Sequence, residues 1–108
     1  MSGSTNIFEI RQADKCTVLT FLKSNTWDFK FLSKCEDELD GLLHEQPVKK
    51  LAFDLQNIGL VSSTLLNIFV GLQRSGIEIE LWNANAEVRD VLETTRLDSV
   101  IRLKPDPE

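Results

Sequence analysis

Short apolar segments alternate along this chain with longer segments in which apolar residues recur at the three- or four-residue spacing of a helix. The short segments are expected to be strands, at residues 7–12, 16–22, 48–55, 77–82 and 100–103. Helices are expected between the later strands, and strand–helix–strand units have parallel strands and right-handed crossovers. The order β-β-α-β-α-β-α-β therefore predicts one α/β domain, in which helices pack against a mixed sheet of four or five strands.

The expected helices carry recognisable end signals. Asp28, Ser62 and Asn85 stand just before the helical segments, where a short polar side chain can cap free backbone N–H groups. Pro47 is expected to end the first helix, and Gly76 follows the second, as glycine does just past a helix end. Only a short polar break separates the first two strands, which makes them a candidate hairpin.

Alternation within the strands predicts which side chains share a face. The third strand places three large apolar side chains on one face, namely Leu51, Phe53 and Leu55. The fourth strand places two acids and an aromatic on one face, namely Glu78, Glu80 and Trp82. We expect the face with the two glutamates to meet water at least in part.

The chain has 108 residues, enough for one modest domain with an apolar core. Residues 1–5 and 104–108 are expected to be flexible tails. The longest apolar run, Ile68 to Leu72, is far shorter than the about 20 residues that a membrane-spanning helix needs. The first residues have no basic start and no apolar run, so no secretory signal is predicted, and we expect a cytoplasmic protein that meets no membrane.

Charge and cysteine usage argue against several classes of function. The formal net charge is −5, from 17 acidic and 12 scattered basic residues, which argues against non-specific binding to nucleic acid. Cys16 and Cys35 are too few for a disulfide framework or a metal cluster and are expected to be buried thiols. The single histidine, His44, is expected near a helix C-terminus. No metal site and no cofactor are predicted.

No catalytic arrangement is visible in the sequence. There is no glycine-rich phosphate loop, no Cys-x-x-Cys pair and no serine in a nucleophile elbow. Four acidic residues are expected to form a solvated helix face, namely Glu36, Asp37, Glu38 and Asp40. A small enzyme or ligand-binding α/β domain is therefore the least favoured hypothesis, and a domain that binds other proteins is preferred.

One segment, residues 54–66, places two serines and a threonine between the end of a central strand and the start of a helix. In open α/β sheets, function gathers beyond the carboxyl ends of the strands. The helix start offers free N–H groups and the positive end of the macrodipole, so a phosphate on Ser63 would be tolerated there. It would add about −1.5 to −2 charge to the surface, enough to reject a partner. Simple capping of the helix by Ser62 and Ser63 is the plainer interpretation.

The helix after Ser62 is apolar over much of its surface. Four of its residues have the spacing of a core stripe, namely Leu65, Ile68, Phe69 and Leu72. Leu66 and Val70 lie about 100–140° round from that stripe. With Leu60 and Val61 in the preceding loop, they are predicted to form an exposed apolar patch that receives a partner. Packing against a neighbouring helix of the same domain is the alternative.

Two blocks of the sequence resemble the STAS domain, the fold of sulphate-transporter C-termini and of bacterial anti-sigma factor antagonists. The first is residues 51–66, LAFDLQNIGLVSSTLL, which is similar to the family's apolar strand, Asp-Leu turn and Asp-Ser-Ser-Gly-Leu helix start. The second is residues 76–103, GIEIELWNANAEVRDVLETTRLDSVIRL, which is similar to the family's later strand, helix and closing strand. A transporter tail is not expected, because neither end of the chain has a membrane segment.

The resemblance implies a switch that regulates transcription by exchanging partners. In the family, a kinase that is itself the anti-sigma factor phosphorylates the serine after the motif aspartate, and a phosphatase reverses the modification. The unphosphorylated domain captures the kinase and frees the sigma factor. Carried over, the phosphorylated residue is Ser63, with Ser62 and Thr64 less favoured, and the family's loop aspartate corresponds to Asp28.

A partner-binding surface is therefore predicted around Ser63. Asp54 is expected nearby, shaping the loop, and Asp28 at the same end of the sheet, with turn former and helix cap as their plainer interpretations. The full set is Asp28, Asp54, Leu60, Val61, Ser62, Ser63, Thr64, Leu66 and Val70. Ser62 stands where the family has aspartate, and Leu65 where it has glycine. The alternative is thus a STAS scaffold that binds a partner, or itself as a weak homodimer, without phosphorylation.

Overall fold

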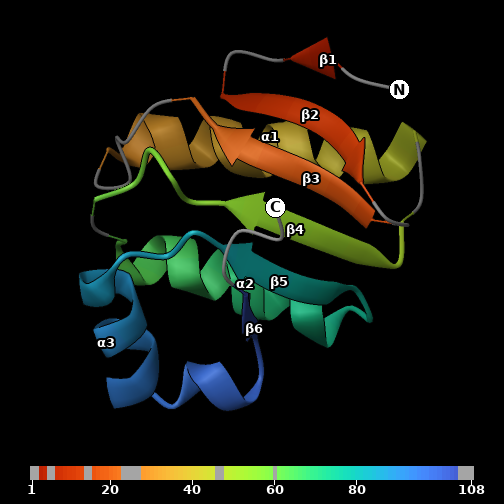
Figure 1. The fold of residues 1–108 in the computed structure, drawn as a ribbon. Coiled ribbons are helices and arrows are strands. Elements are labelled where there is room, and N and C mark those ends of the chain that lie inside the picture. Colours follow the sequence, from red (N-terminus) through yellow and green to blue (C-terminus); the bar gives the residue numbers. More distant parts are fainter. Residues whose placement is uncertain are drawn as a thin grey trace.

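The computed structural model describes residues 3–4, 7–13, 16–22, 28–45, 48–59 and 61–104. Its elements, in chain order, are β1 (Gly3–Ser4), β2 (Phe8–Ala13), β3 (Cys16–Phe21), α1 (Phe29–Glu45), β4 (Lys50–Asp54), α2 (Ser63–Arg74), β5 (Glu78–Trp82), α3 (Ala86–Thr94), the 3-10 helix η1 (Leu97–Ser99) and β6 (Arg102–Lys104) (Figure 1). The predicted α/β element order is confirmed, while η1 was not predicted.

The strands form one mixed sheet in the order β1-β2-β3-β4-β5-β6. β2 and β3 pair antiparallel, which confirms the predicted hairpin, and β3, β4, β5 and β6 pair in parallel. β2 to β6 are the five predicted strands. β1 is an addition of two residues, because Gly3 and Ser4 of the expected N-terminal tail pair with Ile10 and Glu9.

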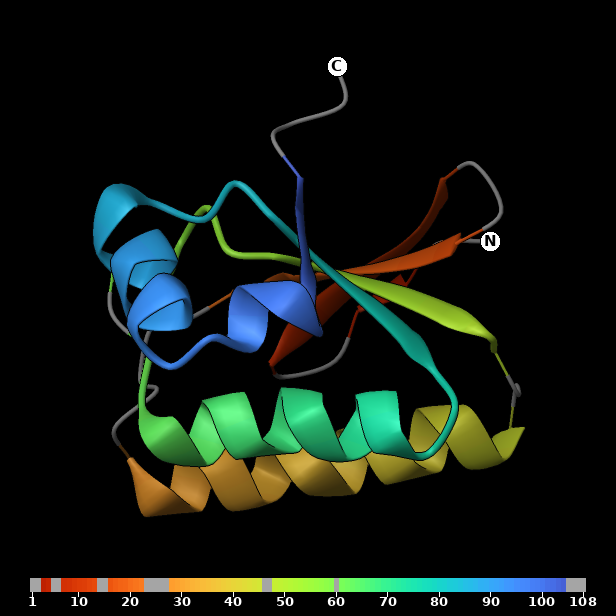
Figure 2. The same cartoon turned by 90° about the horizontal axis from the view of Figure 1, so that it is seen from below.

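Topology decides where the helices lie. Each parallel strand lies beside the one before it, so right-handed crossovers carry every connecting helix to the same face of the sheet. Figures 1 and 2 show α1 and α2 side by side beneath that face, and Val88 and Leu92 of α3 join the same apolar core. The opposite face, called here the helix-free face, carries no helix among the described residues.

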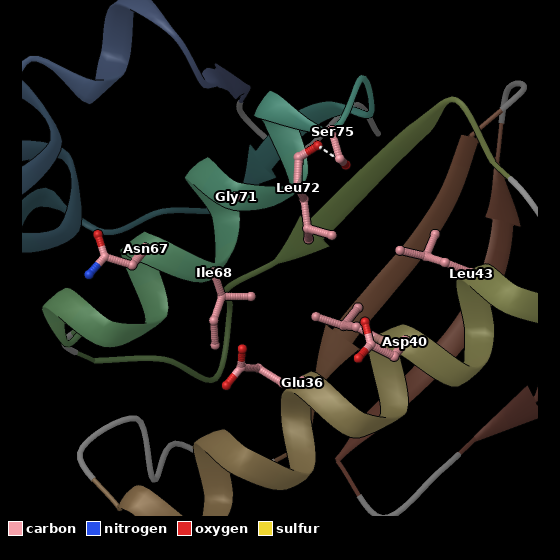
Figure 3. Close-up of a pocket in the computed structure, with 9 residues that line it drawn as sticks. Glu36, Asp40, Leu43, Asn67, Ile68, Gly71, Leu72 and Ser75 are labelled. Atoms are coloured by element: carbon pink, nitrogen blue, oxygen red, sulfur yellow. Dashed lines mark hydrogen bonds between the residues drawn. The ribbon is translucent and has the colours of Figure 1, made fainter.

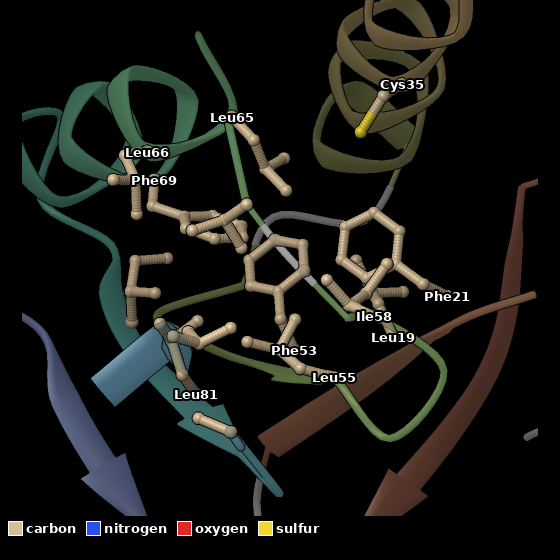
Figure 4. Packing of buried hydrophobic residues seen from close by; sticks show 14 of the residues in the cluster. Leu19, Phe21, Cys35, Phe53, Leu55, Ile58, Leu65, Leu66, Phe69 and Leu81 are labelled. Carbon is tan, nitrogen blue, oxygen red and sulfur yellow. The ribbon is translucent and has the colours of Figure 1, made fainter. Parts of the chain in front are cut away.

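The core lies between the sheet and the helices. Leu51, Phe53 and Leu55 are all buried there, which confirms the predicted face of the third strand. Phe53 packs with its ring centroid 6.0 Å from that of Phe21 in β3 and 4.7 Å from that of Phe69 in α2. Figure 4 shows these rings, and the tilted contact between Phe53 and Phe69 joins the sheet to α2.

The predicted helix starts are confirmed by hydrogen bonds. Asp28 Oδ1 accepts from the N–H of Lys30 at 2.9 Å, and Asn85 Oδ1 accepts from the N–H of Val88 at 2.9 Å. Gly76 follows α2 with φ of 101°, a conformation that glycine adopts without strain. α1 ends at Glu45, with His44 in its last turn as predicted, whereas Pro47 lies outside the described residues.

The face with the two glutamates meets water only in part, as predicted, but most of it is buried. Glu78 is exposed as expected, but Glu80 is only 3% exposed and Trp82 is also buried. The reason is pairing on the helix-free face, since Glu80 Oε2 lies 2.9 Å from Lys50 Nζ and Glu80 Oε1 accepts from Trp82 Nε1 at 3.0 Å. The helix-free face therefore has its own small core, formed by Cys16, Val18, Ala52 and Trp82.

Candidate functional site

The three helix starts meet at one edge of the domain. α1, α2 and α3 each follow the carboxyl end of a strand, and the carboxyl ends of parallel strands lie at the same edge of a sheet. Asp28, Ser62 and Asn85 are therefore placed at a common edge, and Figure 2 shows the first turns of α1 and α2 beside each other. This confirms that Asp28 lies at the same end of the sheet as Ser63.

The loop before α2 is held on both sides by asparagine side chains. Asn57 Nδ2 donates to the carbonyl of Phe21 at 2.8 Å, which ties the loop to the end of β3. Asn85 Nδ2 donates to the carbonyl of Gly59 at 2.9 Å, which ties it to the start of α3. Ile58 between these anchors is buried. The backbone that presents Ser63 is thus positioned by its neighbours rather than by its own sequence alone.

The two serines have different surroundings. Ser62 is buried, and its Oγ accepts a hydrogen bond of 3.2 Å from the N–H of Leu65, so it is the N-cap of α2. Ser63 and Thr64 are exposed. The first turn of α2 carries no acidic residue, so no carboxylate there offsets the positive end of the helix dipole. Ser63 is therefore the exposed serine hydroxyl at an uncompensated helix N-terminus.

Asp54 is 2% exposed and shapes the loop, as predicted. Its Oδ1 accepts from the backbone N–H of Gln56 at 3.1 Å and from Asn83 Nδ2 at 2.9 Å. Its side chain lies on the helix-free face, opposite to α2, and its charged neighbour is Arg11 at 3.7 Å. The expected nearness to Ser63 is thus limited to a shared edge, because the sheet separates the carboxylate from the helix side.

The predicted exposed apolar patch is wrong. Leu66 is only 4% exposed and belongs to the core, and Val70 is half-buried and packs against it. Val61 is buried as well, while Leu60 lies outside the described residues. Of the core stripe predicted from spacing, Leu65 and Phe69 are buried as expected, and Leu66 is buried beside them. Ile68 and Leu72, expected in the core, are left half-buried between α2 and α1.

Sequence reasoning missed the two asparagine anchors. Asn85 is the helix cap that the sequence predicts, and Asn57 lies in the turn after β4, but their carbonyl partners are 26 and 36 positions away in the chain. The available sequence signal was an asparagine next to the apolar Ile58. It indicates a fixed loop, yet the sequence does not identify which carbonyl accepts the bond.

The described residues offer little to metal or redox chemistry. They contain no group of three or more His, Cys, Asp and Glu side chains that could hold a metal ion. Cys16 and Cys35 are both buried, as predicted, and are not joined by a disulfide. Burial raises the pKa of the Cys35 thiol to about 12, with Glu38 and Glu36 adding to the effect, so the thiol stays protonated and unreactive near neutral pH. Within the described part of the chain, no helix is both long and apolar enough to cross a membrane.

Comparison with known proteins agrees with this arrangement. The sequence model of the STAS domain matches residues 8–108. A proposed anti-sigma factor antagonist from Thermotoga maritima has a similar solved structure, with a TM-score of 0.78, 19% identity, and coverage of 92% of this chain and 86% of that one. No curated protein sequence matches significantly.

Two further solved structures are of SpoIIAA from Bacillus. The unphosphorylated anti-sigma factor antagonist SpoIIAA gives a TM-score of 0.68 at 12% identity, covering 94% of this chain and 89% of that one. The phosphorylated form, described as a Bacillus cell fate determinant, gives 0.65 at 14% identity, covering 94% and 92%. At these identities, the likeness establishes the fold.

Proposed function

Because this chain belongs to the STAS domain family, we propose that it is an anti-sigma factor antagonist switched by phosphorylation of Ser63. In this proposal, the unmodified domain captures an anti-sigma factor serine kinase in the cytoplasm, and the phosphorylated domain releases it. A cognate phosphatase restores the first state. The likeness to SpoIIAA, solved in both phosphorylated and unphosphorylated forms, supports this choice among the roles of the family.

The contrast between Ser62 and Ser63 carries the proposal. A kinase needs an accessible hydroxyl, and the Ser62 hydroxyl is buried and used as the cap of α2. Ser63 is exposed at the first position of the helix. Ser62 also takes over the capping role that a short acidic side chain can fill at this position, so the change from the family's aspartate leaves the helix start intact.

The chemistry is a phosphoryl transfer from ATP. The Ser63 oxygen forms a bond to the γ-phosphorus, the bond to the β-phosphate oxygen breaks, ADP leaves, and the hydroxyl proton is lost to the kinase. The product carries about −1.5 to −2 charge at neutral pH. Free N–H groups and the dipole at the start of α2 favour that charge, so the helix remains folded while the surface seen by the partner changes.

The second candidate is a STAS scaffold that binds its partner without phosphorylation. Ser62 favours it, because the aspartate that precedes the acceptor in the family is missing, and with it a negative charge that a kinase could recognise. The two candidates share a binding surface and differ in whether Ser63 is modified.

The test uses the purified chain, ATP and each anti-sigma factor serine kinase encoded in the same genome, with intact-mass measurement. We expect one added phosphate in the wild type and in Thr64→Ala, and none in Ser63→Ala. A phosphopeptide at Ser62 or Thr64 would overturn the residue assignment. Kinase capture without any phosphate would favour the scaffold, and neither capture nor phosphate with any kinase would overturn both candidates.

A further inference from the structure

A groove of about 350 Å³ runs along the outer surface between α1 and α2. Its lining residues recur at helical spacing on both helices, so the groove follows their length. They are Glu36, Leu39, Asp40 and Leu43 of α1, with Asn67, Ile68, Gly71, Leu72 and Ser75 around α2 (Figure 3). The groove lies on the helix side of the domain, away from the three helix starts, and the proposed function does not use it.

The floor of the groove is apolar and open. Leu39 is buried, whereas Leu43, Ile68 and Leu72 are only half-buried and face the groove. Gly71 lowers the wall on the α2 side, because a Cβ atom built there meets no other atom within 4 Å. Glycine inside a helix costs about 0.5–1 kcal/mol relative to alanine, so this opening is not favoured by the helix itself.

The charge of the groove is one-sided. Glu36 and Asp40 line the α1 side of the groove. Figure 3 shows the Glu36 carboxylate directed across the groove towards Ile68. Neither carboxylate has an ion-pair partner among the described residues. The α2 side of the groove is uncharged, and its polar residues are Asn67 and Ser75. α1 as a whole carries five acidic residues and two lysines, a charge of −3 out of −5 for the chain.

We propose that this groove binds one amphipathic, basic helix of a partner protein. Apolar side chains at positions i, i+3, i+4 and i+7 of that helix fit between α1 and α2, as a third helix packs into the groove between two others. Its lysines or arginines then face Glu36 and Asp40. This charge complementarity is the reason that the partner helix is expected to be positively charged.

A second copy of this chain does not fit the same requirement. Pairing two molecules through this groove brings two α1 helices of like charge together, and like charges across an interface are unfavourable. The groove is therefore assigned to a different protein. This inference goes beyond the proposed function and does not depend on Ser63.

The probe is a synthetic fluorescent peptide of about 18 residues, with leucine at the i, i+3, i+4 and i+7 positions and lysine elsewhere. Binding is measured by anisotropy with the unphosphorylated full chain. Gly71→Leu fills the groove without changing its charge. The double variant Glu36→Lys with Asp40→Lys reverses the charge on the α1 side of the groove. We expect each to weaken binding by about tenfold or more.

The matched control makes the same change in charge elsewhere, at the exposed Glu87 and Asp90 of α3, both to lysine. It should bind within about twofold of the wild type. An equal loss in the control would show general attraction to an acidic protein and overturn the proposal, as would unchanged binding by a folded Gly71→Leu. A wild-type dimer in sedimentation that Gly71→Leu dissolves would place a second copy in the groove instead. No kinase enters the experiment, so its failure leaves the Ser63 switch untouched.

Discussion

The two faces of the sheet are built from the same strands, yet they bury their side chains by different means. Under α1 and α2, Phe53 and Leu81 are buried by close apolar packing. On the helix-free face, Asp54 and Glu80 are buried just as deeply by ion pairs and hydrogen bonds. Burial alone therefore does not tell how much a side chain contributes to stability. The contribution depends on whether the side chain is buried by apolar packing or by ion pairs and hydrogen bonds. Mutations on the two faces should therefore change stability by different amounts.

The largest effect is expected on the helix side. Phe53→Ala removes a fully buried ring that contacts the rings of both Phe21 and Phe69, and should lower the free energy of unfolding by about 3–5 kcal/mol in chemical denaturation. Val100→Ala is the control, because Val100 is 47% exposed and should change stability by less than about 0.5 kcal/mol. A Phe53→Ala loss smaller than those of the ion-pair variants would reverse the ranking of the two faces.

The helix side should also be sensitive to alkaline pH. Burial first, then Glu38 and Glu36, raise the pKa of Cys35 from 9.0 to about 12, so the folded state holds its thiol proton where the unfolded chain releases it. The contribution of this thiol to the free energy of unfolding is fully present below about pH 9. It falls as the pH rises towards 12, by up to about 1.4 kcal/mol per pH unit. Between pH 8 and 10.5 we expect a loss of about 1–2 kcal/mol.

Comparison with Cys35→Ala isolates this group, because every other titrating side chain is common to both proteins. The stability difference between wild type and Cys35→Ala, measured by denaturation at each pH, should shrink as pH rises from 8 to 10.5. The pKa of Lys50 is also raised, mainly by its hydrogen bond with Glu80. Its ordinary value is 10.5, so its effect on stability falls above this pH range. A constant difference would mean that the Cys35 thiol is not desolvated in solution.

On the helix-free face, the tighter ion pair should give the next effect. Lys50→Met keeps most of the aliphatic stem but removes the charge 2.9 Å from the buried carboxylate of Glu80. Since the Lys50 side chain is 33% exposed, the expected loss is about 1 kcal/mol. Lys49→Met is the matched control, because Lys49 is exposed and should be near neutral. Equal losses in both variants would show that the pair adds nothing beyond a surface charge.

The contrast between the faces also shows what the sequence could predict. Strand alternation assigned Leu51, Phe53 and Leu55 to one face, because apolar burial needs only the two-residue period. The same period assigned Glu80 to a face that was expected to meet water at least in part, and it did not predict that Glu80 is buried. Its burial depends on Lys50 in the neighbouring strand, and the sequence alone does not give the register that joins them.

The candidate site divides in the same way. The Ser62 cap and the exposed Ser63 follow from local backbone requirements and were predictable. The inward face of α2 was not, because six apolar residues between 65 and 72 allow several rotations of the helix. Contact with both the sheet and α1 selects the rotation that buries Leu66 and leaves Ile68 at the groove. β1 was missed because Gly3 and Ser4 carry no strand signal of their own.

The smallest effect is expected at the other ion pair of the helix-free face. Arg11 lies 3.7 Å from Asp54, and its side chain is 49% exposed, so the solvent screens most of the attraction. Asp54 also accepts hydrogen bonds at Oδ1 from Asn83 and from the backbone of Gln56, so one of its two carboxylate oxygens keeps its partners without the arginine. Arg11→Met should therefore lower stability by less than about 0.5 kcal/mol in the same denaturation assay. A loss above about 1 kcal/mol would mean that Arg11, and not the loop, keeps Asp54 buried, and the two ion pairs would then be of one kind.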